Sequence, residues 1–135
     1  MDTETGRIRV LRFVSAVDCG TAIHPKQVEG QIEGAVAMGI GYALSEEMRY
    51  DDEGRLLNGD LVDYKLIHAD DMPAMTTIVV QSYEPTGPYG AKSVAEVPTN
   101  GPAPAIANAV LHALGVRISE LPITPDRVLR ALGKI

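Results

Sequence analysis

One stretch of the chain places a single carboxylate where it could act as a base. Between Gly87 and Pro98 the chain is rich in glycine, proline and small residues, and Glu96 is the only acidic side chain. Burial among such neighbours would raise the pKa of a carboxyl group, which suits a general base that works near neutrality. The residue types leave the ordinary alternative open, in which Glu96 is solvated or paired with Lys92.

Other residue patterns that carry chemistry are absent. The histidines His24, His68 and His112 have no partner at metal-ligand spacing, so we expect no metal ligands from side chains. No serine stands in a nucleophile elbow, and no glycine-rich string has phosphate-loop or dinucleotide-binding spacing. Cys19 is the only cysteine, which excludes an internal disulfide framework.

Composition excludes further classes. Twelve Lys and Arg against 18 Asp and Glu give a net charge of -6, which makes nucleic acid and anionic membranes poor partners. No apolar run is long enough to span a bilayer, and the first residues lack the pattern of a signal peptide, so we expect a cytoplasmic protein with no membrane partner. The length of 135 residues, 45% of them hydrophobic, predicts one domain or a part of one over residues 1–135.

Residue periodicity predicts a mixed α+β fold. We expect strands near residues 7–18, 46–57 and 76–83, the second of these folded about an acidic turn, and helices near 25–44, 102–114 and 125–132. Pro25 would open the first helix, while Asn100 and Thr124 would cap the other two and Gly115 would end the second. The loop between the last strand and the second helix holds too many breakers for regular structure.

The long helix predicted at 25–44 combines an apolar stripe with a stripe of small residues. The apolar stripe comprises Val28, Ile32, Val36, Ile40 and Ala43, and the small one comprises Gly30, Gly34, Ala37 and Gly41, with Gly39 beside it. Each helical glycine costs about 1 kcal/mol relative to alanine. The glycines therefore indicate close approach of a neighbouring element, which we favour, or of a ligand.

Three segments resemble one family, the molybdenum-binding subunits of the xanthine dehydrogenase and aldehyde oxidase enzymes. The first comprises Asp18-Cys19-Gly20, His24-Pro25 and Gly30-Gln31-Ile32-Glu33-Gly34-Ala35; the second is Tyr89-Gly90-Ala91-Lys92-Ser93-Val94-Ala95-Glu96; and the third is Leu121-Pro122-Ile123-Thr124-Pro125-Asp126-Arg127-Val128. They are similar to the family's Gly-Gln-Val/Ile-Glu-Gly block, its Gly-Ala-Lys-x-Val-Gly-Glu loop and its Leu-Pro-Leu-Thr-Pro-x-Arg-Val ending. The resemblance covers residues 7–132 and implies the C-terminal part of such a subunit.

The resemblance implies a role for each matched residue. Glu96 would be the catalytic glutamate, which takes a proton while water supplies the oxygen for oxidative hydroxylation of the substrate. The residues that would contact the molybdopterin cofactor are Gly30 and Gln31 in the helix and, through their backbone, Lys92, Ser93 and Val94 in the loop. Ala95 and Val97 replace the family's usual glycine and proline beside the glutamate, so we expect an N-heteroaromatic substrate that is either xanthine-like or nicotinate-like.

The family's molybdenum-binding subunit is several times longer than this chain. We therefore expect a fragment or a small subunit of a split enzyme, inactive in isolation, which shares its cofactor with a missing part of the subunit. Iron-sulfur clusters and FAD are expected on partner subunits or domains. The alternative is a non-catalytic interaction domain that keeps the family sequence only as a scaffold. In either case we expect exposed apolar surface that a companion subunit or self-association covers.

Overall fold

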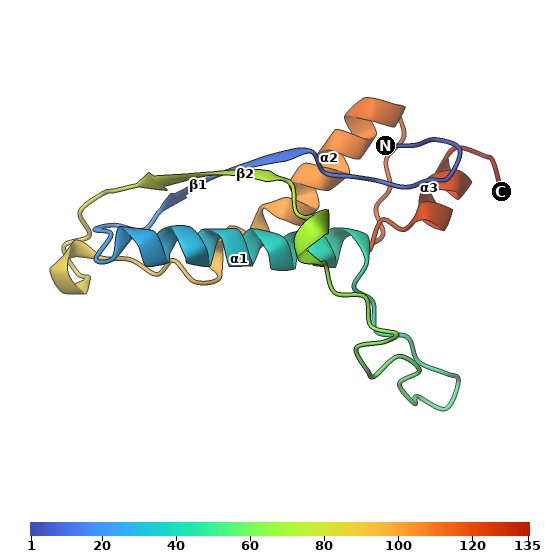
Figure 1. Ribbon diagram of the computed structural model, residues 1–135, viewed down its shortest axis with the longest axis horizontal. Coiled ribbons are helices and arrows are strands. Elements are labelled where there is room, and N and C mark those ends of the chain that lie inside the picture. Colours follow the sequence, from blue (N-terminus) through green and yellow to red (C-terminus); the bar gives the residue numbers. More distant parts are fainter.

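The computed structural model describes residues 1–135 and centres on one long helix (Figure 1). A pair of strands runs along one side of this helix, a second helix crosses it, and a third lies beside the C-terminus. The elements in chain order are β1 (Arg12–Asp18), α1 (Pro25–Leu44), η1 (Ala69–Asp71), β2 (Ala74–Val80), η2 (Pro88–Gly90), η3 (Val97–Asn100), α2 (Pro102–Leu114) and α3 (Pro125–Ala131), where η marks a short 3₁₀ helix. The predicted α+β class is confirmed.

Helix α1 forms at the predicted residues. Pro25 occupies its first turn, and Nδ1 of His24 accepts a hydrogen bond from the backbone N–H of Gln27 at 3.2 Å, which satisfies one free donor of that turn. The members of the predicted apolar stripe, Val28, Ile32, Val36, Ile40 and Ala43, are all buried. Complete burial of a valine or isoleucine side chain contributes about 1.5–3 kcal/mol, so this stripe is the main attachment of α1 to the core.

Strands β1 and β2 pair in parallel, from Arg12 opposite Ala74 to Asp18 opposite Val80. The predicted strands at 7–18 and 76–83 are thus present, but the first is shorter and the second is shifted. Both differences come from the partner strand, because a residue joins a ladder only where a neighbour is available. Residues 7–11 have no partner, because β2 begins at Ala74, opposite Arg12. Beyond Val80 the chain leaves the ladder and contacts other segments.

The prediction of two strands within residues 46–57 is wrong. The segment holds only one isolated bridge, between Tyr50 and Leu56, and the Asp51 carboxylate organises its turn by accepting the N–H of Arg55 at 2.7 Å. The segment projects away from the body of the molecule (Figure 1), so no third strand or helix packs on it. An isolated two-stranded ribbon is marginal in water, which explains why alternation alone did not produce one.

The two C-terminal helices lie at their predicted residues to within one residue, but neither predicted N-cap residue makes a capping hydrogen bond. Gly115 ends α2 with a φ of +71°, as expected. Thr124 takes the N-cap position of α3, but its hydroxyl donates to the Asp126 carboxylate at 2.6 Å and caps no backbone group. Asn100 does not cap α2, because it is the last residue of η3 and Gly101 takes the N-cap position. The sequence pattern did not reveal η3, which directly precedes the helix.

Gly39 of α1 differs from Gly30 and Gly34 in what lies beside it. A Cβ at Gly39 would lie 2.7 Å from Cγ of Pro102 and 3.0 Å from the carbonyl oxygen of Thr99, so here the missing side chain allows α2 and η3 to approach α1. A Cβ at Gly30 or Gly34 would meet nothing within 4 Å. Packing within the chain thus explains Gly39, whereas the exposed Gly30 and Gly34 have no such neighbour.

Large apolar side chains are exposed at many points of the surface, as expected, and two of these regions bear on assembly. One is the outer face of the sheet, where Val14, Ile78 and Val80 are between 44% and 52% exposed. The other is the projecting segment, where Leu61 and Val62 are more than three-quarters exposed. Separately, none of the helices has the combination of length and hydropathy that a bilayer span requires.

Candidate functional site

The loop that carries Glu96 is attached to the turn between β1 and α1. Gly20 and Ala91 form an antiparallel bridge, and the backbone N–H of Lys92 donates to the carbonyl oxygen of Cys19 at 2.8 Å. The turn and the loop therefore form one backbone unit, although more than 70 residues separate them in sequence. This unit lies beyond the carboxyl ends of the two parallel strands, where open α/β sheets usually bind ligands.

Close packing explains two glycines of this unit. Gly20 has a φ of +63°, and a Cβ there would lie 2.4 Å from the carbonyl oxygen of Gly90. Gly90 has a φ of +78°, and a Cβ there would lie 2.5 Å from the ring of Tyr83. A side chain at Gly20 would force the turn and the loop apart, and one at Gly90 would displace the Tyr83 ring and the Thr21 hydroxyl.

The Asp18 carboxylate joins three segments. It accepts hydrogen bonds from Nζ of Lys92 at 2.7 Å, from Oγ of Ser82 at 2.9 Å and from the backbone N–H of Gly20 at 2.9 Å. These donors, led by Lys92, lower the pKa of Asp18 to about 2. The alternative in which Lys92 pairs with Glu96 is wrong, because Asp18 at the end of β1 takes the ammonium group.

Glu96 differs from its expected setting. Its side chain is exposed, and its carboxylate makes no hydrogen bond or ion pair within the chain. The predicted burial is therefore not supplied by this chain, because the loop turns Val94 and Pro98 inward and leaves Glu96 between them facing outward. The backbone is nevertheless fixed, since the Glu96 carbonyl oxygen accepts the N–H of Thr99 at 3.0 Å as η3 begins.

The expected cofactor-binding residues keep several free hydrogen-bonding groups. Gln31 is exposed on α1 beside Gly30, and its amide bonds to no other side chain or backbone group of the chain. In the loop, the backbone N–H groups of Ser93 and Val94 find no acceptor within the chain, whereas the N–H of Lys92 is taken by the Cys19 carbonyl. The free donors thus come from Gln31, Ser93 and Val94.

Sequence reasoning missed Asp18 and Ser82, which hold the loop. Asp18 belongs to the Asp-Cys-Gly motif, but the motif alone does not predict a contact for its side chain. No neighbour of Ser82 in sequence distinguishes it from other serines. Their partnership depends on the pairing of β1 with β2, which brings the ends of both strands together. The position of Asp18 at the end of a predicted strand was the one available signal.

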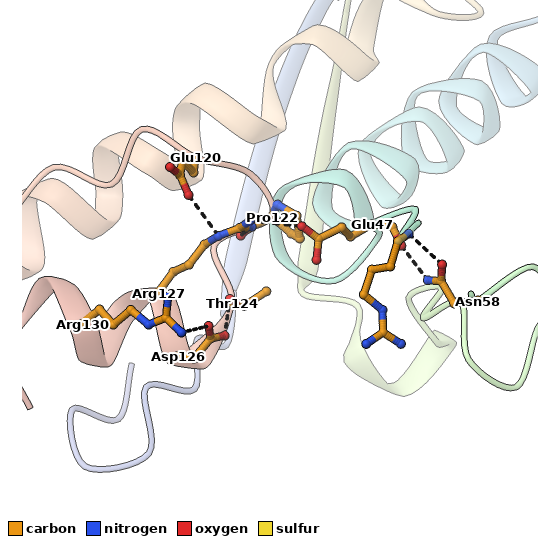
Figure 2. Close-up of polar contacts among 9 residues, drawn as sticks. Glu47, Asn58, Glu120, Pro122, Thr124, Asp126, Arg127 and Arg130 are labelled. Carbon is orange, nitrogen blue, oxygen red and sulfur yellow. Dashed lines mark hydrogen bonds and ion pairs between the residues drawn. The ribbon is translucent and has the colours of Figure 1, made fainter. Parts of the chain in front are cut away.

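A second polar cluster lies at the other end of α1 (Figure 2). Arg127 of α3 donates to the carbonyl oxygen of Pro122 at 2.6 Å and forms ion pairs with Glu47 at 3.0 Å and Glu120 at 3.4 Å. An open cavity of about 480 Å³ adjoins these residues. Because every charged partner of Arg127 belongs to a different segment, this cluster fixes α3 against the end of α1.

No group of three or more His, Cys, Asp or Glu side chains in the structure has an arrangement that could hold a metal ion. The chain's own contribution to a site therefore consists of hydrogen-bond donors and one free carboxylate. Such a set suits an organic group rich in acceptor atoms better than a bare metal ion.

Comparison with known proteins identifies the family. Residues 1–73 match the model of the molybdopterin cofactor-binding domain family. Over 136 aligned residues the chain is 43% identical to a probable hypoxanthine oxidase of Escherichia coli strain K12, which covers 100% of this chain and 14% of that protein. It is 40% identical to a putative xanthine dehydrogenase molybdenum-binding subunit of the same organism, covering 95% of this chain and 17% of the relative.

Solved structures agree. Carbon monoxide dehydrogenase from Oligotropha carboxidovorans matches with a TM-score of 0.89 and 31% identity over 99% of this chain and 17% of that one. Quinoline 2-oxidoreductase from Pseudomonas putida 86 matches with a TM-score of 0.87 and 38% identity over 93% of this chain and 16% of that one. The chain belongs to the molybdopterin cofactor-binding domain family and corresponds to part of a molybdenum-binding subunit. It spans about one-sixth of the length of these relatives or less.

Proposed function

We propose that this chain supplies the catalytic base and part of the cofactor site of an assembled molybdenum oxidoreductase. The observation that supports this most directly is Glu96, whose carboxylate is exposed and unpaired while the backbone on both sides of it is fixed. The Asp18 carboxylate, by contrast, is occupied by the ammonium group of Lys92. Glu96 instead keeps its oxygens available to a reacting molecule.

The proposed role of Glu96 is to accept a proton. When bound, the molybdenum cofactor would supply the oxidising centre, and the chain would supply the base at Glu96. A base of this kind works best where water is excluded, and nothing in this chain covers the carboxylate. The covering residues would therefore come from the remaining part of the molybdenum-binding subunit, which is the principal partner in this proposal.

Gly30, Gln31, Ser93 and Val94 would contact the molybdopterin. The open space beside Gly30 would admit a bulky group to the helix surface, and the Gln31 amide and the free N–H groups of the loop would donate to it. The Lys92 side chain is committed to Asp18 and its N–H to Cys19, so Lys92 would act by holding this segment of the loop in place.

An N-heteroaromatic compound is the proposed substrate class, either xanthine-like or nicotinate-like. Two relatives support it by name, the probable hypoxanthine oxidase and the quinoline 2-oxidoreductase. A third, a subunit of a 6-hydroxypseudooxynicotine dehydrogenase complex, is 37% identical over 95% of this chain. That relative is a subunit of a complex, which also supports partner subunits here; we propose that these carry the iron-sulfur clusters and FAD.

Co-production of the chain with a companion molybdenum-binding part tests this function. The expected result is a complex that co-purifies, contains molybdenum, and hydroxylates an N-heteroaromatic compound with oxygen from labelled water. The same companion part without this chain serves as the control and should lack the activity. A complex that forms but has no Glu96-dependent turnover would instead support the non-catalytic scaffold.

A further inference from the structure

The Asp18 side chain sits where three segments meet, and one of them leads to Glu96. We propose that Asp18 is a positioning residue for Glu96 and acts by holding Lys92. This inference rests on the proposed function, because it assigns Asp18 a part in placing the base of that function. It adds a residue outside the loop to the machinery that the loop was expected to contain.

The first step in the argument is that Asp18 itself is rigidly held. It is the last residue of β1, and the parallel register places it opposite Val80 at the end of β2. Ser82 donates to both of its carboxylate oxygens at 2.9 Å, and the N–H of Gly20 donates at 2.9 Å. These hydrogen bonds restrict rotation of the Asp18 side chain, so its carboxylate is fixed relative to the ends of β1 and β2.

The second step is that Lys92 attaches the loop to the end of β1. Its ammonium lies 2.7 Å from the Asp18 carboxylate, and its backbone N–H donates to Cys19, the residue after Asp18. Lys92 is thus bound to the end of β1 through both its side chain and its backbone. The pKa of Lys92 is raised, chiefly by Asp18 and to a lesser extent by Glu84, so the ammonium stays charged.

The third step is that the loop has another attachment just after Glu96. Pro98 of η3 is buried, and the Thr99 carbonyl oxygen lies against α1 at Gly39. Residues 93–97 lie between the two attachments, and only the half-buried Val94 among them packs on the core, so releasing Lys92 would loosen the start of the segment that carries the base. The released ammonium would also become available to pair with Glu96, four residues away, and to mask its charge.

The first experiment measures the loop without the cofactor. In the full chain, Asp18→Asn keeps the size of the side chain and an acceptor for Gly20 and Ser82, but removes the charge that holds Lys92. Hydrogen–deuterium exchange should accelerate about fivefold or more at the amides of Lys92 and Thr21, which bond across the turn and the loop. The matched control is Asp126→Asn, which removes an ion-paired carboxylate from α3 and should leave this exchange unchanged.

The second experiment measures catalysis in the assembled enzyme. Asp18→Asn should lower kcat by roughly 10- to 100-fold, as small misplacements of a catalytic group do, with little change in KM or molybdenum content. Lys92→Met should behave alike, and the double variant should be no slower than the slower single variant, because both changes break the same link. Lys92→Arg should restore most of the activity, because a guanidinium can also pair with Asp18.

Two results would overturn the positioning role. One is that Asp18→Asn leaves hydrogen–deuterium exchange in the loop unchanged. The other is that Asp18→Asn accelerates this exchange but the assembled enzyme keeps full turnover. The proposed function has a separate test. If the Glu96→Gln enzyme were fully active, Glu96 would not be the base, whereas the exchange experiment would still show whether Asp18 holds the loop through Lys92.

Discussion

At the scale of single residues, two carboxylates near the same turn and loop differ in their contacts. Asp18 accepts hydrogen bonds from Lys92, Ser82 and Gly20, whereas Glu96 accepts none through its side chain. Both residues lie in or beside the unit that joins the turn after β1 to the loop before α2. Their substitution should therefore affect different properties.

Glu96→Gln should abolish turnover without affecting the fold. Glutamine keeps the shape of the side chain but cannot accept the proton, so hydroxylation in the assembled enzyme should fall by about 10²–10⁴-fold. The thermal midpoint and molybdenum content should stay near those of the parent, since the carboxylate has no partner to lose. Steady-state kinetics and metal analysis measure both, and near-normal turnover would show that another group is the base.

Gln31→Ala should have the opposite profile. Its amide is exposed and unpaired, so its loss should not destabilise the chain, but it would remove a donor to the proposed cofactor. We expect a molybdenum content lowered by about tenfold at limiting cofactor, in line with the effect of removing a supporting ligand contact. Gln27→Ala is the control, because it alters an exposed glutamine one turn earlier in α1. Equal molybdenum content in both variants would contradict the assignment.

Asp18 should contribute a defined part of the acid sensitivity of the chain. Its folded-state pKa of about 2 lies below the ordinary value of 3.8, so its stabilising contribution is present above pH 3.8 and is lost as the pH falls toward 2. Lys92, Ser82 and the Gly20 amide face the carboxylate, and Glu84 approaches Lys92 from the loop.

Denaturant unfolding of the parent and of Asp18→Asn between pH 2 and pH 7 measures this contribution. The difference in unfolding free energy between the two proteins should be constant above about pH 4 and should shrink at lower pH. Asp2 and Asp126 also have lowered pKa values, caused by groups other than Asp18, and remain in both proteins, so their effects cancel in the difference. A difference that stays constant down to pH 2 would exclude the Asp18 ion pair as its source.

At the scale of elements, α1 organises the molecule, because the sheet, η3 and α2 all pack on it. Its apolar stripe faces the core, and its glycines play two distinct roles. Gly39 brings η3 and α2 into contact with the helix, whereas Gly30 and Gly34 border open space. The helix thus links the core to the surface proposed for the cofactor.

Alanine substitutions should separate these two roles. Gly39→Ala should destabilise the chain by roughly 1–3 kcal/mol, because the new methyl group would overlap Pro102 and the Thr99 carbonyl. Gly34→Ala is the matched change on the open side and should stabilise it by about 0.5–1 kcal/mol through helix propensity. Denaturant unfolding compares the two, and equal effects would contradict the packing at Gly39.

At the scale of the whole molecule, the chain exposes more apolar surface than a self-sufficient domain needs. The outer face of a parallel sheet is usually covered, yet Val14 and Ile78 are about half exposed on this one. The projecting segment adds Leu61 and Val62. These surfaces fit the proposed assembly, in which another part of the subunit covers them.

The isolated chain should therefore associate or bind an apolar dye. Size-exclusion chromatography with light scattering should show self-association, and the fluorescence of the dye 1-anilinonaphthalene-8-sulfonate should rise in its presence. Both signals should fall when the companion molybdenum-binding part is added. A stable monomer that does not bind the dye would show that these surfaces need no partner.

The sequence by itself determined the elements whose signals are local. Helices 25–44 and 102–114 matched residue for residue, and the third differed by one residue, because apolar spacing and flanking prolines and glycines act within a few residues. The family was also evident from three short motifs, and comparison with known proteins confirmed it. The loop around Glu96 could be identified from its composition, but its contacts could not.

The tertiary structure decided everything that depends on distant residues. The limits of β1 and β2 follow from where each finds the other, and the predicted strands within residues 46–57 failed because nothing packs beside them. The sequence offered Lys92 as a partner for the nearby Glu96, yet the fold brings it to Asp18, 74 residues away. A charged side chain pairs with whichever opposite charge the fold places within reach, and this depends on the pairing of the strands rather than on sequence separation.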